Sequence, residues 1–167
     1  FMKVLFIDTV HEILQKRLEE KGVTCIDGTR FSMKECQSEL QKGVHGIVVR
    51  SRFRMDAALL DVAGDLKFIA RSGAGMENID EDYCRKRNIR LFNAPEGNRT
   101  AVGEHALGML LALFNNLKKG DAEVRKGIWD REGNRGIELT GKTVGIIGYG
   151  NNGSAFAKVL RGFDCRI

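Results

Sequence analysis

The most informative segment of the sequence is Lys142-Thr143-Val144-Gly145-Ile146-Ile147-Gly148-Tyr149-Gly150-Asn151-Asn152-Gly153. Its first half is apolar and rich in β-branched residues, like a buried strand, and it leads into the pattern Gly-x-Gly-x-x-Gly. Residues 154–160 follow with apolar side chains at helical spacing. A strand, a glycine-rich turn and a helix in this order predict the first unit of a dinucleotide-binding Rossmann domain.

Each glycine of this pattern has its own physical task. Gly148 permits a tight turn, Gly150 lets the backbone approach a pyrophosphate, and Gly153 lets the helix pack closely on the strand. The pyrophosphate would lie on free N–H groups at the positive end of the helix. A glycine-rich turn that binds nothing is the alternative. The acidic residue that would contact the adenosine ribose is expected about 20 residues further on, past Ile167, so these residues do not decide between NAD and NADP.

The composition is that of an ordinary globular protein with a modest positive charge. The 167 residues include 27 basic and 22 acidic side chains, for a net charge of +5, and 43% of the residues are hydrophobic. No apolar run approaches the roughly 20 residues needed to span a bilayer. No aromatic residues interleave with the basic clusters as nucleic-acid stacking would require. We therefore expect small anions as ligands, and neither nucleic acid nor a membrane.

Cysteine usage predicts a reducing compartment. Cys25, Cys36, Cys84 and Cys165 show neither Cys-x-x-Cys spacing nor a histidine at the spacing of metal ligands. Free thiols therefore fit best, and no basic-then-apolar leader opens the chain. We expect a cytoplasmic protein without a metal.

The front of the chain alternates short apolar strands with helices. Strands are predicted at 4–7, 23–26, 46–49, 66–70 and 89–92, and helices at about 13–22, 32–40, 55–62 and 79–87. This alternation is typical of a parallel sheet that is covered on both faces. We therefore predict a doubly wound, flavodoxin-like α/β domain over residues 2–98, followed by the start of a Rossmann domain over residues 99–167.

A long apolar helix is predicted from about Val102 to about Lys118, and such a helix must be covered by other elements. The segment that follows is polar and glycine-rich except for Ile128-Trp129. A tryptophan in a polar segment indicates either an arm that packs on a partner subunit or a side chain tucked against its own domain. We expect an arm over residues 117–136, and hence a homodimer.

Two polar segments follow neighbouring strands of the predicted sheet. Arg50-Ser51-Arg52 comes after one strand, and Ser72-Gly73-Ala74-Gly75 comes after the next. Guanidinium groups can clamp a carboxylate or phosphate, and small residues let backbone N–H groups cradle an anion. Each segment alone is more simply a surface loop. Because ligands of such sheets bind at the carboxyl ends of the strands, the two together predict an anion site.

The three histidines give no catalytic signal. Glu104-His105 lies on the long helix, where adjacent side chains point in different directions, and neither His11 nor His45 has a visible partner. We expect structural roles for all three.

The order of several motifs identifies a resemblance. The chain resembles the first half of a D-2-hydroxyacid dehydrogenase, within that family most of all the D-3-phosphoglycerate dehydrogenases, over nearly all of residues 2–167. The segments that carry this resemblance are 47–52, 71–80, 92–98, 103–107, 124–129 and 141–150.

The resemblance implies a role for each segment. Residues 2–98 would form the substrate domain, without a C-terminal segment that returns to pack on it. Residues 99–167 would form the first part of the NAD-binding domain. Arg50 and Arg52 would lie near the substrate's acidic groups, and the backbone of Ser72, Gly73, Ala74 and Gly75 would hold its carboxylate. Ala74 would also approach the nicotinamide. The pyrophosphate would contact the loop of Gly148, Tyr149, Gly150, Asn151, Asn152 and Gly153.

The sequence departs from the family at two asparagines. Asn151 and Asn152 stand where the family usually has a basic and then an apolar residue, so the N–H groups remain but a cation is lost. The arginine, glutamate and histidine that the family uses for hydride transfer would all follow Ile167. No catalytic residue is therefore expected in this chain, which we interpret as the N-terminal part of a longer enzyme.

The predicted function is interconversion of a D-2-hydroxy acid, 3-phosphoglycerate foremost, and its 2-keto acid with NAD. A phosphorelay receiver, which shares the flavodoxin-like pattern, would need an aspartate where Arg50 stands. A non-catalytic module for anion binding or dimerisation is the alternative that the residues leave open.

Overall fold

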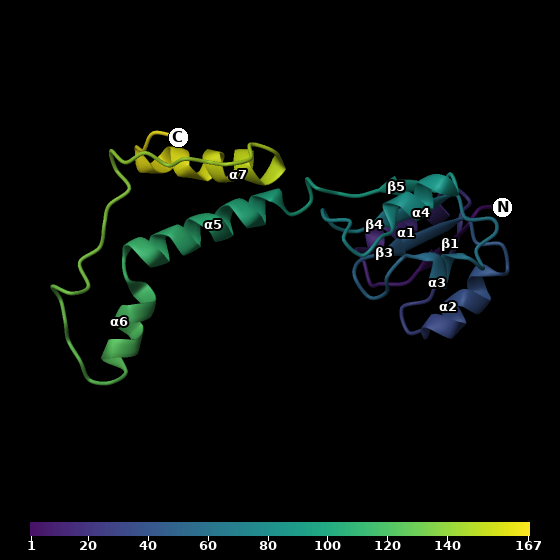
Figure 1. The fold of residues 1–167 in the computed structure, drawn as a ribbon, viewed down its shortest axis with the longest axis horizontal. Coiled ribbons are helices and arrows are strands. Elements are labelled where there is room, and N and C mark those ends of the chain that lie inside the picture. Colours follow the sequence, from purple (N-terminus) through teal and green to yellow (C-terminus); the bar gives the residue numbers. More distant parts are fainter. The chain divides into compact units, whose positions relative to one another are not determined.

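The computed structural model describes residues 1–167, which divide into two units, Phe1–Pro95 and Glu96–Ile167 (Figure 1). The first unit holds five parallel strands: β1 Lys3–Phe6, β2 Thr24–Asp27, β3 Gly46–Val49, β4 Phe68–Arg71 and β5 Arg90–Phe92. Their order in the sheet is β2-β1-β3-β4-β5. This order confirms the doubly wound, flavodoxin-like α/β fold that the alternation of strands and helices predicts.

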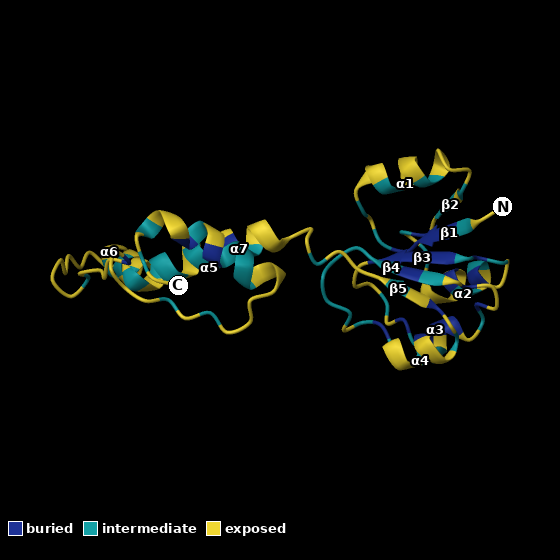
Figure 2. Cartoon of the chain, turned by 90° about the horizontal axis from the view of Figure 1, so that it is seen from above, coloured by how far each residue is buried: buried dark blue, intermediate teal, exposed yellow.

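Helices cover both faces of this sheet. They are α1 Glu12–Glu19, α2 Met33–Leu40, α3 Ala57–Leu60 and α4 Glu81–Lys86. Figure 2 shows α1 on one face and the other three helices on the opposite face. Because side chains alternate along a strand, Leu5 belongs to the larger core under α2, α3 and α4, whereas Val4 and Phe6 belong to the smaller core near α1.

The start of α2 follows directly from its sequence. The Ser32 hydroxyl accepts a hydrogen bond from the Glu35 N–H at 3.3 Å, and the Glu35 carboxylate accepts one from the Ser32 N–H at 2.7 Å. The hydrogen bonds from the Ser32 backbone and hydroxyl keep the pKa of Glu35 below its ordinary value. This reciprocal pair is the predicted capping box.

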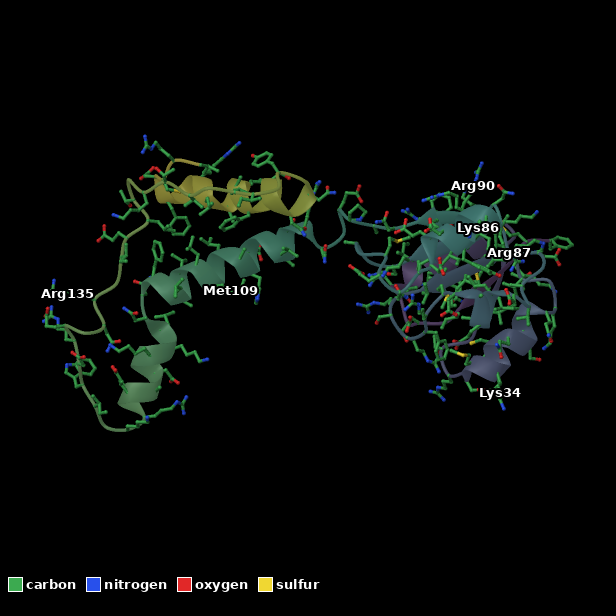
Figure 3. The ribbon with its side chains drawn as sticks, in the orientation of Figure 1. Lys34, Lys86, Arg87, Arg90, Met109 and Arg135 are labelled. Carbon is green, nitrogen blue, oxygen red and sulfur yellow. The ribbon has the colours of Figure 1, made fainter.

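The second unit contains α5 Arg99–Phe114, α6 Leu117–Val124, α7 Asn151–Leu160 and the 3-10 turn η1 Arg161–Phe163. The prediction of one helix as far as Lys118 is wrong. Asn116 has a φ of 50°, in the left-handed region, and this residue separates α5 from α6. Two apolar residues of α5 that the sequence predicts to be covered are exposed: Met109, labelled in Figure 3, is 57% exposed, and Leu113 is 72% exposed.

The strand predicted at residues 143–147 is also not formed as such. Thr143 makes a single parallel bridge with Arg166. The Val144 N–H donates to the Arg166 carbonyl at 2.8 Å, and the Arg166 N–H donates to the Lys142 carbonyl at 2.8 Å. A strand requires a ladder of hydrogen bonds to a neighbour, and the residues beside this segment supply one bridge only. Ile147 is consequently fully exposed.

Helices α5 and α7 pack closely at one point. Gly103 of α5 is buried, and a Cβ atom there would lie 2.9 Å from the carbonyl carbon of Ala155 and 3.0 Å from its oxygen. The absence of a side chain at Gly103 therefore lets the backbone of α5 approach that of α7. None of the helices combines the length and the apolar run that crossing a bilayer requires.

Candidate functional site

The carboxyl ends of β3 and β4 lie next to each other, as the sequence predicts. Val49 is paired with Arg71 in the sheet, and the Ser72 N–H donates to the Val49 carbonyl at 2.8 Å. The segments 50–52 and 72–75 therefore leave the sheet side by side at its carboxyl edge. In a doubly wound fold this edge is the expected ligand site.

Arg52 uses its guanidinium group within the protein. Its Nη1 donates to the carbonyls of Ile7, Gly28 and Thr29 at 3.1, 3.2 and 2.5 Å, and its Nη2 donates to that of Phe31 at 2.5 Å. The group also lies 4.8 Å from the centre of the Phe53 ring. Arg52 thus joins the loops that follow β1 and β2.

Asp8 holds the backbone of the same segment. Its Oδ2 accepts hydrogen bonds from the N–H groups of Arg50, Ser51 and Arg52 at 2.6, 3.1 and 3.3 Å. Three consecutive N–H groups that converge on one carboxylate form an anion nest, which Asp8 fills from within the protein. The Arg50 side chain, by contrast, is exposed and has no hydrogen bond or ion pair, so its charge is free for a ligand.

The backbone of 72–75 is partly used and partly free. The Ser72 and Gly73 N–H groups donate to the carbonyls of Val49 and Arg71. The Ala74 carbonyl accepts from the Asn93 side-chain amide at 2.7 Å, which fixes the peptide. The N–H groups of Ala74 and Gly75 have no partner. These two are the donors that the segment offers to an anion.

Arg71 joins this edge, although we did not assign it from the sequence. A Cβ atom on Gly73 would lie 1.5 Å from Nη1 of Arg71, so the guanidinium lies over the glycine. The Arg71 Nε is buried without a partner. The signal available in the sequence was its place as the last residue of a strand at the predicted site. Glu77 lies over Gly75 in the same way, with a carboxylate oxygen 2.2 Å from the position of a Cβ atom, and this exposed side chain would repel a bound anion unless it turned away.

Two of the three histidines have structural roles, as expected. The Nδ1 atom of His11 accepts the Ile13 N–H at 3.2 Å at the start of α1, and the Nδ1 of His45 accepts the Lys3 N–H at 3.1 Å. His105 is exposed on α5. None of them is placed as an acid or base of this edge.

The glycine-rich loop adopts the tight turn that its sequence predicts. Gly148 has a φ of 90°, a value that side chains disfavour, and α7 begins at Asn151 with Gly150 as its N-cap. A Cβ atom on Gly153 would lie 2.1 Å from the Gly148 carbonyl oxygen, so this glycine closes the loop.

The loop also leaves donors and space for an anion. The N–H groups of Asn151, Asn152 and Gly153 have no partner, because the Ser154 N–H makes the first bond of the helix, to Gly150, at 3.0 Å. Nothing lies within 4 Å of a Cβ position on Gly150. These free donors and the open space suit the pyrophosphate of a dinucleotide.

One known protein family matches most of the chain. Residues 4–159 match the family described as D-isomer specific 2-hydroxyacid dehydrogenase, catalytic domain. The chain belongs to this family, which confirms the resemblance found in the sequence.

Particular relatives are similar over almost the whole chain. The D-3-phosphoglycerate dehydrogenase of Archaeoglobus fulgidus is 36% identical over 166 residues, which are 99% of this chain and 31% of that protein. This chain thus spans about a third of the curated relatives it matches. The TT0316 protein of Thermus thermophilus has a TM-score of 0.78 at 30% identity, over 99% of this chain and 54% of its own. An acyclic imino acid reductase solved with NADPH and D-Arg has a TM-score of 0.82 over 99% of this chain and 55% of its own, but at 21% identity it is alike in fold alone.

Proposed function

We propose that this chain is the substrate-binding part, and the beginning of the cofactor-binding part, of an NAD-dependent D-2-hydroxyacid dehydrogenase. Its reaction would interconvert a D-2-hydroxy acid and the 2-keto acid, with 3-phosphoglycerate as the hydroxy acid. The observation that carries the proposal is the set of free donors at one sheet edge: the Arg50 guanidinium and the N–H groups of Ala74 and Gly75. A cytoplasmic location and a place in serine biosynthesis belong to the same proposal.

The substrate end of the mechanism follows from these donors. Two neighbouring N–H groups, from Ala74 and Gly75, can bind the carboxylate of a hydroxy acid. Arg50 and Arg71 supply positive charge beside them, which suits a substrate that carries a second anionic group. The similarity to D-3-phosphoglycerate dehydrogenases supports a phosphate as that second group.

We propose that the loop of residues 148–153 binds the cofactor. Its free N–H groups, at the positive end of α7, would bind the pyrophosphate. When bound, NAD supplies the acceptor or donor of the hydride at C2 of the acid. The contribution of this chain is orientation and charge stabilisation. We assign proton transfer to no residue of this chain and propose that it comes from sequence that follows Ile167, since the relatives are about three times as long.

An assay of the full-length protein tests this proposal. NADH oxidation is followed with 3-phosphohydroxypyruvate, glyoxylate and pyruvate, for the wild type and for Arg50→Gln. Loss of a charge-assisted hydrogen bond is expected to raise the KM for 3-phosphohydroxypyruvate by about tenfold or more. The matched control is Arg54→Gln, because Arg54 is an exposed arginine four residues away that pairs with Asp56.

Three outcomes separate the possibilities. Turnover with a selective effect of Arg50→Gln supports the proposal. Turnover in which Arg50→Gln and Arg54→Gln behave alike contradicts the substrate site. Binding of these acids without turnover of any of them favours the non-catalytic anion-binding module.

We also propose that the protein is a homodimer held partly by the arm of residues 117–136. Trp129 is 84% exposed in this arm, and Val124 and Ile128 are exposed beside it. The arm keeps its form through its own hydrogen bonds, such as Lys119 Nζ to the Gly133 carbonyl at 2.7 Å. Apolar side chains that a pre-shaped arm presents to solvent are suited to a subunit interface. Sedimentation of the full-length protein as a monomer at micromolar concentration would contradict the dimer.

A further inference from the structure

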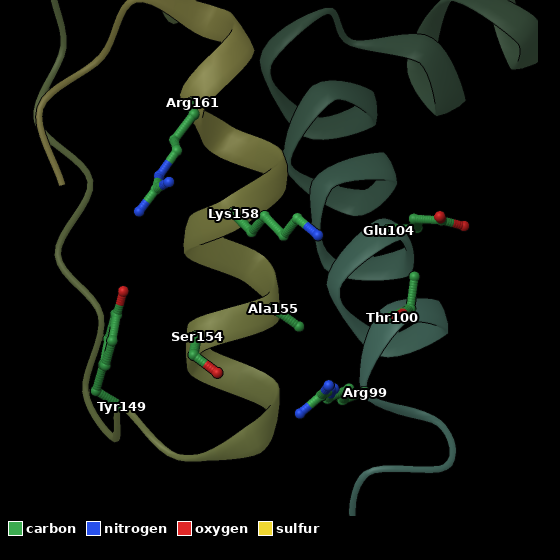
Figure 4. A pocket seen from close by; sticks show the side chains of 8 residues that line it. All are labelled: Arg99, Thr100, Glu104, Tyr149, Ser154, Ala155, Lys158 and Arg161. Carbon is green, nitrogen blue, oxygen red and sulfur yellow. The ribbon is translucent and has the colours of Figure 1, made fainter.

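A groove lies between α5 and α7, beside the glycine-rich loop and apart from its free N–H groups (Figure 4). The groove is open to solvent and has a volume of about 570 Å³. Its lining comes from both helices, from η1 and from the loop: Arg99, Thr100, Glu104, Tyr149, Ser154, Ala155, Lys158 and Arg161. The close approach of the helices at Gly103 brings the two walls together.

The lining of this groove is strongly cationic. Arg99, Lys158 and Arg161 contribute three positive charges against the single carboxylate of Glu104. None of the three makes an ion pair; in the second unit the paired basic residues are Lys119, Arg125 and Arg135. From Asn151 to Phe163 the chain has no acidic residue at all. The positive charge is therefore not balanced within the protein.

The remaining lining can complete a polar ligand site. Thr100, Tyr149 and Ser154 supply hydroxyl groups. The Ser154 hydroxyl donates to the Asn151 carbonyl at 3.1 Å, so the hydroxyl oxygen can still accept hydrogen bonds. The small Ala155 side chain lies between Ser154 and Lys158. Figure 4 shows Lys158 extending toward α5 and Arg161 extending away from α5, on the side of Tyr149.

We propose that this groove binds the phosphate group of a phosphorylated ligand through Arg99, Lys158 and Arg161. Guanidinium and ammonium groups bind phosphate oxygens through charge-assisted hydrogen bonds, and the charge of a phosphate would relieve the repulsion among these side chains. The glycine-rich loop has no charged residue from Gly148 to Gly153, whereas the groove that adjoins it is lined by three cations. The phosphate belongs either to a dinucleotide or to a free phosphorylated acid.

The proposal does not depend on dehydrogenase activity, because binding is measured directly. Isothermal titration of the full-length protein uses inorganic pyrophosphate as the probe. The double variant Lys158→Ala/Arg161→Ala is compared with Lys86→Ala/Arg90→Ala, which removes the same charge from exposed, unpaired positions of the first unit (Figure 3). Thermal unfolding of each variant verifies that the fold is kept.

The groove variant is expected to weaken pyrophosphate binding by about tenfold, and the control variant to leave it within about twofold. Binding of pyrophosphate should also weaken as salt increases. If NADH competes with pyrophosphate, the phosphate is that of a dinucleotide. If 3-phosphoglycerate competes and NADH does not, it is that of a free acid. Absence of saturable pyrophosphate binding, or equal weakening in both variants, overturns the proposal.

Discussion

Replacing Arg52 by glutamine is expected to destabilise the first unit. The guanidinium donates to the carbonyls of Ile7, Gly28, Thr29 and Phe31, which belong to two different loops. Glutamine is shorter and has a single amide in place of the planar fork, so it cannot reach all four. The carbonyls of Ile7 and Gly28, whose hydrogen bonds are partly buried, would lose this donor.

The size of the effect follows from these bonds. A hydrogen bond to a charged group contributes about 1.5–3 kcal/mol, and the bonds of one guanidinium are not additive. Because the Arg52 side chain is exposed, water replaces some of the bonds. We therefore expect a loss of about 2–4 kcal/mol in the free energy of unfolding. For a unit of this size, that loss lowers Tm by about 8 °C or more.

The assay is thermal unfolding of the full-length protein, with hydrogen exchange to locate the change in the loops after β1 and β2. The control is Arg50→Gln, since the Arg50 side chain has no partner and its loss should change stability by no more than about 0.5 kcal/mol. If Arg52→Gln melts like the wild type and raises the KM as much as Arg50→Gln does, the Arg52 side chain binds substrate and does not stabilise the loops.

Other consequences follow from single residues. Gly153→Ala should lower both stability and NADH affinity, because the new Cβ would lie 2.1 Å from the Gly148 carbonyl oxygen. Gly150→Ala should lower NADH affinity alone, because nothing lies within 4 Å of its Cβ position. Unfolding curves and NADH titrations of the two variants test this difference. Ser32→Ala should cost about 1 kcal/mol of stability through loss of the cap on α2, measured by urea unfolding. Burial raises the pKa of the Cys84 thiol from 9.0 to about 11. Between these two pH values the thiol is therefore protonated in the folded state and ionised in the unfolded state. Stability should therefore fall as the pH rises from 9 to 11, by up to about 3 kcal/mol, and Cys84→Ala should flatten this part of the pH profile.

Several local features of this protein can be predicted from its sequence, although the break between α5 and α6 at Asn116 was not. Short apolar runs separated by helices specify a parallel sheet, and Ser32 with Glu35 specifies the start of α2, because these signals depend on neighbours only a few residues away. The turn at Gly148 is local in the same sense. The position of the two candidate anion segments at one edge of the sheet also follows from the predicted parallel strands, since these strands all end on the same side.

The contacts of each side chain at that edge depend on residues far away in the sequence, so they could not be predicted from local patterns. Arg50 and Arg52 are equivalent in the sequence, yet Arg52 is held by carbonyls that lie 21 to 45 positions away. Asp8, distant in sequence, fills the nest that the backbone of the same segment forms. The strand at residues 143–147 failed for a related reason, because a strand exists through its neighbours and not through its own composition. Long-range hydrogen bonds therefore give Arg50 and Arg52 different roles, although their local sequence is equivalent.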